Sequence, residues 1–77
     1  MKAIEILQQV FGNVPNYREK CIYNLAGRDD LLLRNAVHLL EREYGVRVHE
    51  KEYQTVTHAP IDSLHEFFTK MQHEQAE

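Results

Sequence analysis

The chain has 77 residues and a mass of 9.1 kDa, which is the size of one small domain. Hydrophobic residues make up 43% of the sequence, enough for a single core, and we expect one domain over residues 1–77. The 9 basic and 12 acidic residues give a net charge of −3. This charge argues against a nucleic-acid-binding protein, because such proteins usually carry a basic excess.

The cysteine content and hydropathy exclude further classes. The single cysteine, Cys21, cannot form an intrachain disulfide or a metal site built from several cysteines. No apolar run approaches the ~20 residues that a membrane-spanning helix needs. Glu5, Gln8 and Gln9 interrupt the first twelve residues, unlike the apolar core of a secretory signal. We therefore expect a cytoplasmic protein that does not associate with membranes.

The first predicted element is an amphipathic helix over residues 2–11, which Gly12 ends. Its apolar residues follow the i, i+3, i+4, i+7 spacing of one helix face: Ala3, Ile4, Leu7, Val10 and Phe11. Residues 13–28 show no period and are interpreted as a long connection lying on the core. A connection of this length is unusual in a small domain, so it is either partly helical or functional.

The central helix is predicted over residues 29–44. Asp29 or Asp30 can cap its start, and Gly45 is a typical terminator. Its apolar stripe consists of Leu33, Ala36, Val37, Leu40 and Tyr44. Residues 46–48 alternate like a strand but have nothing to pair with, so they are predicted to be an extended linker.

The last part of the chain is predicted to hold a single helical turn at residues 50–54 and a final helix over residues 60–72. Pro60 suits the first position of that helix, and residues 73–77 are expected to fray. The inner face of the final helix consists of Ile61, Leu64, Phe67, Phe68 and Met71. The predicted fold is all-α: a small, irregular four-helix bundle with three main helices and one short helix.

Four segments of the sequence resemble the acyl carrier protein family. Residues 27–31 read Gly-Arg-Asp-Asp-Leu where the family has Gly-x-Asp-Ser-Leu, at the start of its second helix. Residues 40–46, Leu-Glu-Arg-Glu-Tyr-Gly-Val, are similar to the end of that helix. Residues 55–57 and 61–64 resemble the family's last loop and fourth helix. The resemblance covers nearly the whole chain and implies an acyl-carrier-like fold.

The chain departs from this family at the residue that carries the cofactor. The family's serine holds a phosphopantetheine arm, and Asp30 stands at that position here. A carboxylate cannot accept the arm in the same way, so no cofactor is expected. Asp30 is interpreted either as a helix cap or as a fixed negative charge where the phosphate would lie.

A literal Asp-Ser-Leu occurs at residues 62–64, but only 14 residues follow Ser63. Ser63 is therefore interpreted as an ordinary serine at a helix start. Phosphopantetheine is expected only if an unexpected serine such as Ser63 is modified.

The resemblance implies a non-enzymatic protein that docks to partner proteins of a fatty-acid or polyketide-type biosynthetic system. The central helix carries mixed charges, so its partner should not present the usual basic surface. The candidate partner-binding residues are Asp29, Asp30, Leu31, Arg34 and Glu41.

Two alternatives remain open. In the first alternative, the chain is a functional acyl or peptidyl carrier that is modified at an unexpected serine. In the second, it is a small helical regulatory protein. In the second case, exposure of the apolar face of the last helix would indicate a homodimer or a partner site. The spacing of the five histidines does not suggest a metal site, and no catalytic motif is present.

Overall fold

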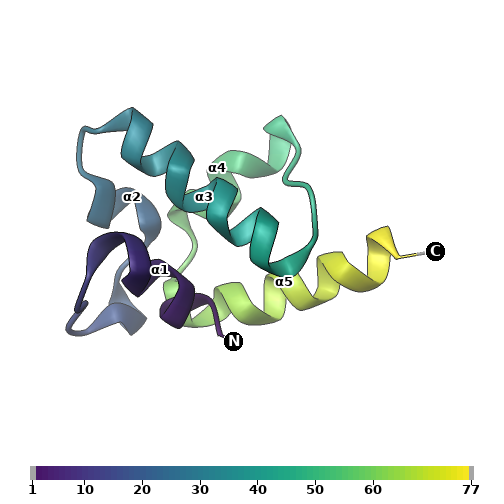
Figure 1. Ribbon diagram of the computed structural model, residues 1–77, viewed down its shortest axis with the longest axis horizontal. Coiled ribbons are helices and arrows are strands. Elements are labelled where there is room, and N and C mark those ends of the chain that lie inside the picture. The colour runs from purple at the N-terminus through teal and green to yellow at the C-terminus, as the bar shows by residue number, and fades with distance from the viewer. Residues whose placement is uncertain (1, 77) are drawn as a thin grey trace.

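The computed structural model describes residues 2–76, which contain five α-helices, one short 3₁₀ helix and no strand (Figure 1). The all-α prediction is therefore confirmed, but the expected four helices are in fact five. The elements are α1 (Ala3–Phe11), η1 (Tyr17–Glu19), α2 (Ile22–Ala26), α3 (Asp30–Tyr44), α4 (Glu50–His58) and α5 (Ile61–Gln75). None of the described helices is both long and apolar enough to cross a membrane.

Helix α2 lies within the connection that showed no period, so this segment is partly helical. The side chain of Asn24 accepts hydrogen bonds from the Cys21 backbone N–H at 3.2 Å and from the Cys21 thiol at 3.1 Å. Gly27 ends the helix with a φ of 64°, a conformation that favours glycine. Five residues make little more than one turn, which is too short to produce a recognisable apolar period.

Helix α4 extends to His58, so the prediction of a single turn ending at residue 54 is wrong. Val56 and Thr57 are buried against the rest of the molecule, and this packing stabilises the additional turn. The buried Thr57 hydroxyl donates a hydrogen bond to the Gln54 carbonyl at 3.1 Å.

Helix α5 also differs from its predicted bounds, because Pro60 is its N-cap and the helix continues to Gln75. The Gln75 side chain accepts from the Arg47 N–H at 2.9 Å and donates to the Arg47 carbonyl at 2.8 Å. Residues 73–75 are therefore helical rather than frayed. The predicted fraying of Glu77 lies outside the described residues.

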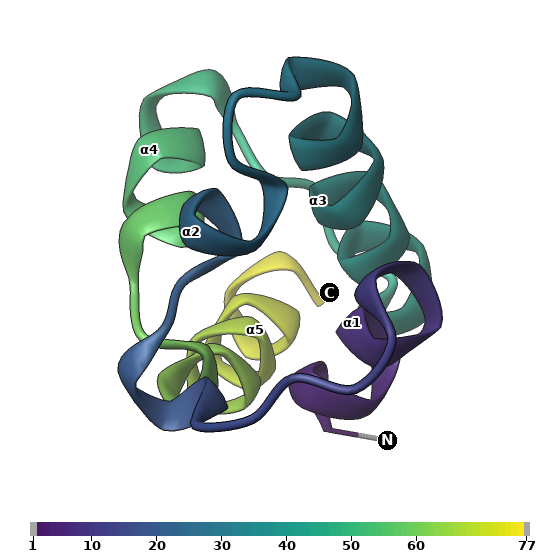
Figure 2. The same cartoon turned by 90° about the vertical axis from the view of Figure 1, so that its left-hand side faces the viewer.

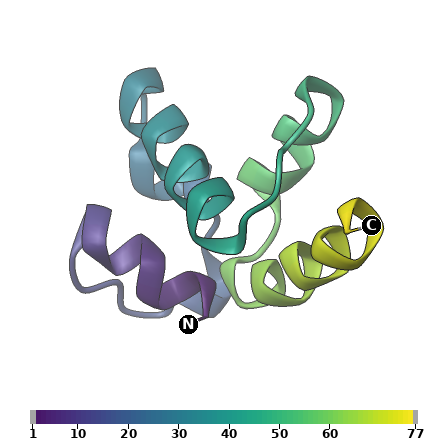
Figure 3. The ribbon, with the colours of Figure 1, turned by 45° about the vertical axis from the view of Figure 1, so that its right-hand side comes forward.

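The helices pack around one core. Helix α1 contacts α3 and α5, while α2 contacts α3 and α4 (Figure 2). In Figure 3, α3 and α4 form the upper part of the molecule, and α1 and α5 form the lower part. The predicted apolar stripe of the central helix is buried along its whole length. The core consists of Ala3, Ile6, Leu7, Ile22, Ala26, Leu33, Ala36, Val37, Leu40, Tyr44, Val46, Val56, Ile61, Leu64, Phe68 and Met71.

Candidate docking site at the start of helix α3

Two adjacent aspartates at the start of α3 have different environments. The Asp29 carboxylate accepts a hydrogen bond from the Leu32 N–H at 3.1 Å, so Asp29 is the N-cap. Asp30 is the first helical residue, and its side chain is 77% exposed. Since Asp29 already caps the helix, the Asp30 carboxylate is free to face solvent. The interpretation of Asp30 as the helix cap is therefore wrong.

The Asp30 carboxylate has one close charged neighbour on its own helix. Its Oδ2 lies 3.5 Å from Nε of Arg34, one turn further along α3, and the Arg34 side chain is 57% exposed. An exposed pair at this spacing contributes only about 0.3–0.5 kcal/mol. The pair is therefore weak enough for a binding partner to separate it.

Leu31 places an apolar side chain beside these charges. It is 70% exposed, whereas Leu33 on the same helix is buried. The other large exposed apolar residue in the described chain is Tyr23, whose ring stacks on His58 at 4.8 Å. The start of α3 thus presents a carboxylate and an exposed apolar group side by side.

Arg34 also contacts the facing helix α4. Its guanidinium carbon lies 5.2 Å from the centre of the Tyr53 ring, a cation–π distance. Burial raises the pKa of the Tyr53 hydroxyl, Arg34 partly opposes that rise, and Asp30 and Glu50 add to it. The Tyr53 hydroxyl oxygen is buried and has no hydrogen-bond partner among the described residues. This pairing was not predicted from the sequence, because it joins residues of two different helices.

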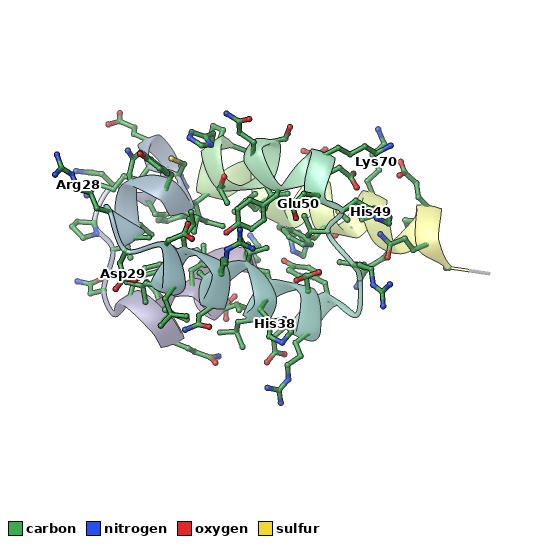
Figure 4. All side chains as sticks on the ribbon, turned by 90° about the horizontal axis from the view of Figure 1, so that it is seen from above. Arg28, Asp29, His38, His49, Glu50 and Lys70 are labelled. Carbon is green, nitrogen blue, oxygen red and sulfur yellow. The ribbon has the colours of Figure 1, made fainter. Side chains whose placement is uncertain are left out.

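A cleft of about 310 Å³ separates α3 from α4 beside this pair. Figure 4 shows Asp29 and His38 along α3 and Glu50 at the start of the facing helix. The His38 side chain is exposed. The cleft is lined by Arg34, Asn35, Val37, His38, Glu41, Val48, Glu50 and Tyr53.

Glu41 differs from the other predicted partner-binding residues. It lies 11 residues after Asp30, about 16 Å along the helix axis at ~1.5 Å per residue. Its carboxylate accepts a hydrogen bond from the Val48 N–H at 2.8 Å and lies 3.8 Å from Nδ1 of His38. Its side chain is only 24% exposed. Glu41 thus holds the linker that follows α3, whereas the other four residues of the predicted set are exposed, and among them Asp29 is engaged as the helix cap.

Ser63 is not brought together with the start of α3. It lies in the first turn of α5, where its hydroxyl donates a hydrogen bond to the Pro60 carbonyl at 2.7 Å. The start of α5 and the start of α3 lie apart in both Figure 1 and Figure 2. This is the ordinary position of a serine at a helix start, as its sequence context indicates.

The apolar face of α5 belongs to the core. Ile61, Leu64, Phe68 and Met71 are buried, and Phe67 is half-buried. This face therefore does not provide the exposed surface that would have indicated a homodimer. Within residues 2–76, no group of three or more His, Cys, Asp or Glu side chains is placed to hold a metal ion.

Comparisons with known proteins do not assign the chain to a family. No protein-family model, no curated protein and no solved structure matches it.

Proposed function

We propose that this chain is an acyl-carrier-like, non-enzymatic binding protein that docks to partner proteins through the start of α3, without a phosphopantetheine arm. Its partners belong to a fatty-acid or polyketide-type biosynthetic system. The observation that carries the proposal is the exposed Asp30 carboxylate, at the position of the family's modified serine. The proposal places the protein in the cytoplasm, where a buried free thiol such as Cys21 stays reduced.

The order of the helices supports the resemblance. The chain begins with α1, and the long connection of residues 13–28 leads to α3, the helix that carries the motif. The shorter helix α4 and the final helix α5 follow it. Gly27 lies between α2 and α3, so the Gly-x-Asp-Asp-Leu segment forms the turn that leads into α3. A phosphate at this position in the family would lie at the same helix end.

The charge at this helix end supports a role for Asp30 in recognition. The N-terminus of a helix favours negative charge, and the capping requirement is already met by Asp29. Asp30 can therefore present a permanent negative charge to a partner where a modified serine would present a phosphate. Such a protein would occupy a carrier-binding surface without delivering an acyl group.

Leu31 and Arg34 define what the partner should offer. An exposed leucine gains free energy when it enters an apolar pocket, at roughly 25 cal/mol per Å² of apolar surface buried. The flanking carboxylate and guanidinium require a cation and an anion beside that pocket. The expected partner surface therefore combines an apolar depression with charges of both signs.

The test is the intact mass of the protein after incubation with coenzyme A and a broad-specificity phosphopantetheinyl transferase. We expect no change for the wild-type chain and a gain of one phosphopantetheine for Asp30→Ser. A double variant, Asp30→Ser with Ser63→Ala, should gain the same mass and so locate the arm on residue 30.

Two results would overturn the proposal. A mass gain in the wild-type chain that disappears in Ser63→Ala would make it a working carrier with an unexpected attachment site. An unmodified Asp30→Ser variant that retains wild-type helicity by circular dichroism would show that the start of α3 is not a carrier-type surface.

A further inference from the structure

A pocket away from the start of α3 lies where α1, η1 and α5 meet. Helix α1 and η1 both pack against α5, and Figure 2 shows η1 beside the start of α5. The Ile61 N–H donates a hydrogen bond to the Lys20 carbonyl at 2.9 Å, which ties that start to the residue after η1. The pocket has a volume of about 210 Å³, and the buried residues Ala3 and Ile61 form part of its wall. Packing between three elements therefore fixes its shape.

Each of the three elements contributes a basic side chain to this pocket. Lys2 is the N-cap of α1, Arg18 lies in η1, and His65 lies in the second turn of α5. Within residues 2–76, neither Lys2 nor Arg18 forms an ion pair with a carboxylate. Asp62 is the carboxylate that lines the pocket beside them. Two cations against one carboxylate leave an excess of positive charge, although the whole chain has a net charge of −3.

A buried hydroxyl fixes the ring of His65. Its Nδ1 lies 2.8 Å from the hydroxyl oxygen of Tyr44, whose side chain is buried. Burial raises the pKa of the Tyr44 hydroxyl, and a hydrogen bond from the Ala3 backbone to its oxygen partly opposes that rise. A protonated hydroxyl that accepts from Ala3 donates its own hydrogen to Nδ1, so Nε2 of a neutral His65 carries the ring hydrogen. His65 therefore keeps an N–H donor on Nε2 in either protonation state.

The charge and size of the pocket favour one class of ligand. A cation would be repelled by Lys2 and Arg18, and a neutral ligand would leave both charges uncompensated. The planar guanidinium of Arg18 matches two oxygens of an oxyanion with parallel N–H donors. The volume equals that of about seven water molecules at ~30 Å³ each, which admits a phosphate or sulfate group and few further atoms.

We propose that the pocket between α1, η1 and the start of α5 binds a small oxyanion, a phosphate or sulfate group, through Lys2, Arg18 and His65. Arg18 supplies paired donors, Lys2 supplies a second charge, and His65 supplies its Nε2 hydrogen. The partial positive charge at the starts of α1 and α5 adds to this attraction, while Asp62 weakens it. This site goes beyond the proposed function, because it requires neither a carrier-type partner nor any role of Asp30.

The test is a titration of the isotope-labelled protein with sodium sulfate, at an ionic strength held constant with sodium chloride. We expect saturable amide shifts in the millimolar range that are confined to residues 2–4, 17–18 and 61–65. The Nε2 resonance of His65 should move along the same curve. Inorganic phosphate and glycerol 3-phosphate, titrated in the same way, distinguish a free ion from a phosphate ester as the ligand, since the tighter binder identifies the source.

Variants at exposed positions separate this pocket from general charge effects. Arg18→Gln should weaken sulfate binding about three- to fivefold, the effect of losing one exposed charged contact. Arg28→Gln, which removes an exposed arginine outside the pocket, is the matched control and should leave binding unchanged. Asp62→Asn removes the opposing carboxylate and should tighten binding by a similar factor. Circular dichroism checks that each variant keeps the wild-type helicity.

Three results would overturn the proposal. One is a set of shifts that do not saturate at constant ionic strength, because sulfate would then only screen the surface. Another is an equal loss of affinity in Arg18→Gln and Arg28→Gln, or weaker binding in Asp62→Asn. The third is an unchanged Nε2 resonance of His65 at saturation, because the ion would then lie outside the pocket that this ring lines.

Discussion

Asp29 and Asp30 are chemically identical neighbours with different roles, and their contributions to stability should differ. Asp29→Ala removes the N-cap of α3, which typically costs about 1 kcal/mol. Asp30→Ala removes an exposed ion pair of about 0.3–0.5 kcal/mol and a charge at the helix start of about 0.3–1 kcal/mol. Alanine recovers about 0.7 kcal/mol of this loss through its higher helix propensity at the first helical position. Urea unfolding followed by circular dichroism should therefore show the larger loss for Asp29→Ala. Equal losses, or a larger loss for Asp30→Ala, would mean that Asp29 is not the cap.

The tyrosines make stability dependent on alkaline pH. Burial raises the pKa values of Tyr44 and Tyr53 above the ordinary value of 10.0. The folded state thus prefers the protonated hydroxyls, and this contribution is complete below about pH 10. It is lost as the pH rises through the folded-state values. Tyrosinate absorbance should show two late-titrating groups, and Tyr53→Phe should remove one of them. If all four tyrosines of the chain titrated together near the ordinary pKa, this expectation would be contradicted.

At this scale, local patterns in the sequence predicted only part of the candidate site. The pair Asp29–Asp30 predicted a helix start, because capping depends on residues that are adjacent in the chain. The contact between Arg34 and Tyr53 was not predictable, because it requires α3 and α4 to pack together. The internal bond of Glu41 to Val48 was missed for a similar reason, since it depends on the path of the linker.

At the scale of elements, the last turns of α5 depend on the linker that follows α3. Gln75→Ala removes both hydrogen bonds to Arg47, each contributing about 0.5–1.5 kcal/mol at most in this exposed setting. Amide hydrogen exchange of residues 73–76 should accelerate several-fold, while that of the first turns of α5 stays unchanged. Glu74→Ala, an exposed neighbour, is the matched control. Equal acceleration in both variants would indicate that the Gln75 hydrogen bonds do not hold this end.

The accuracy of the predicted elements follows their length and apolar pattern. The helices α1 and α3 were predicted within a residue, since each has a continuous apolar stripe and a glycine at its end. The helix α2 has only five residues, which is too few for an apolar period, so its start depends on the cap at Cys21. The end of α5 depends on Gln75, whose partner is 28 residues away.

The whole molecule is small, so its stability rests on few large side chains. Typical domains gain roughly 0.05–0.15 kcal/mol per residue, which gives about 4–12 kcal/mol for 77 residues. Phe68 is fully buried and stacks on Tyr44 with ring centres 5.0 Å apart. Its contact with Tyr44 links α5 to the end of α3, and it also contacts Phe67 on its own helix.

Phe68→Ala should therefore remove a large share of the total stability. The cavity left by a buried phenylalanine costs about 3–5 kcal/mol, whereas Phe68→Leu keeps most of the volume and should cost much less. Phe67→Ala, at a half-buried position on the same helix, should lie between wild type and Phe68→Ala. Urea midpoints by circular dichroism should rank wild type, Phe68→Leu and Phe68→Ala in falling order. If Phe67→Ala lowers the midpoint more than Phe68→Ala does, α5 presents a different face to the core, and the assignment of Leu64 and Met71 to that core is wrong as well.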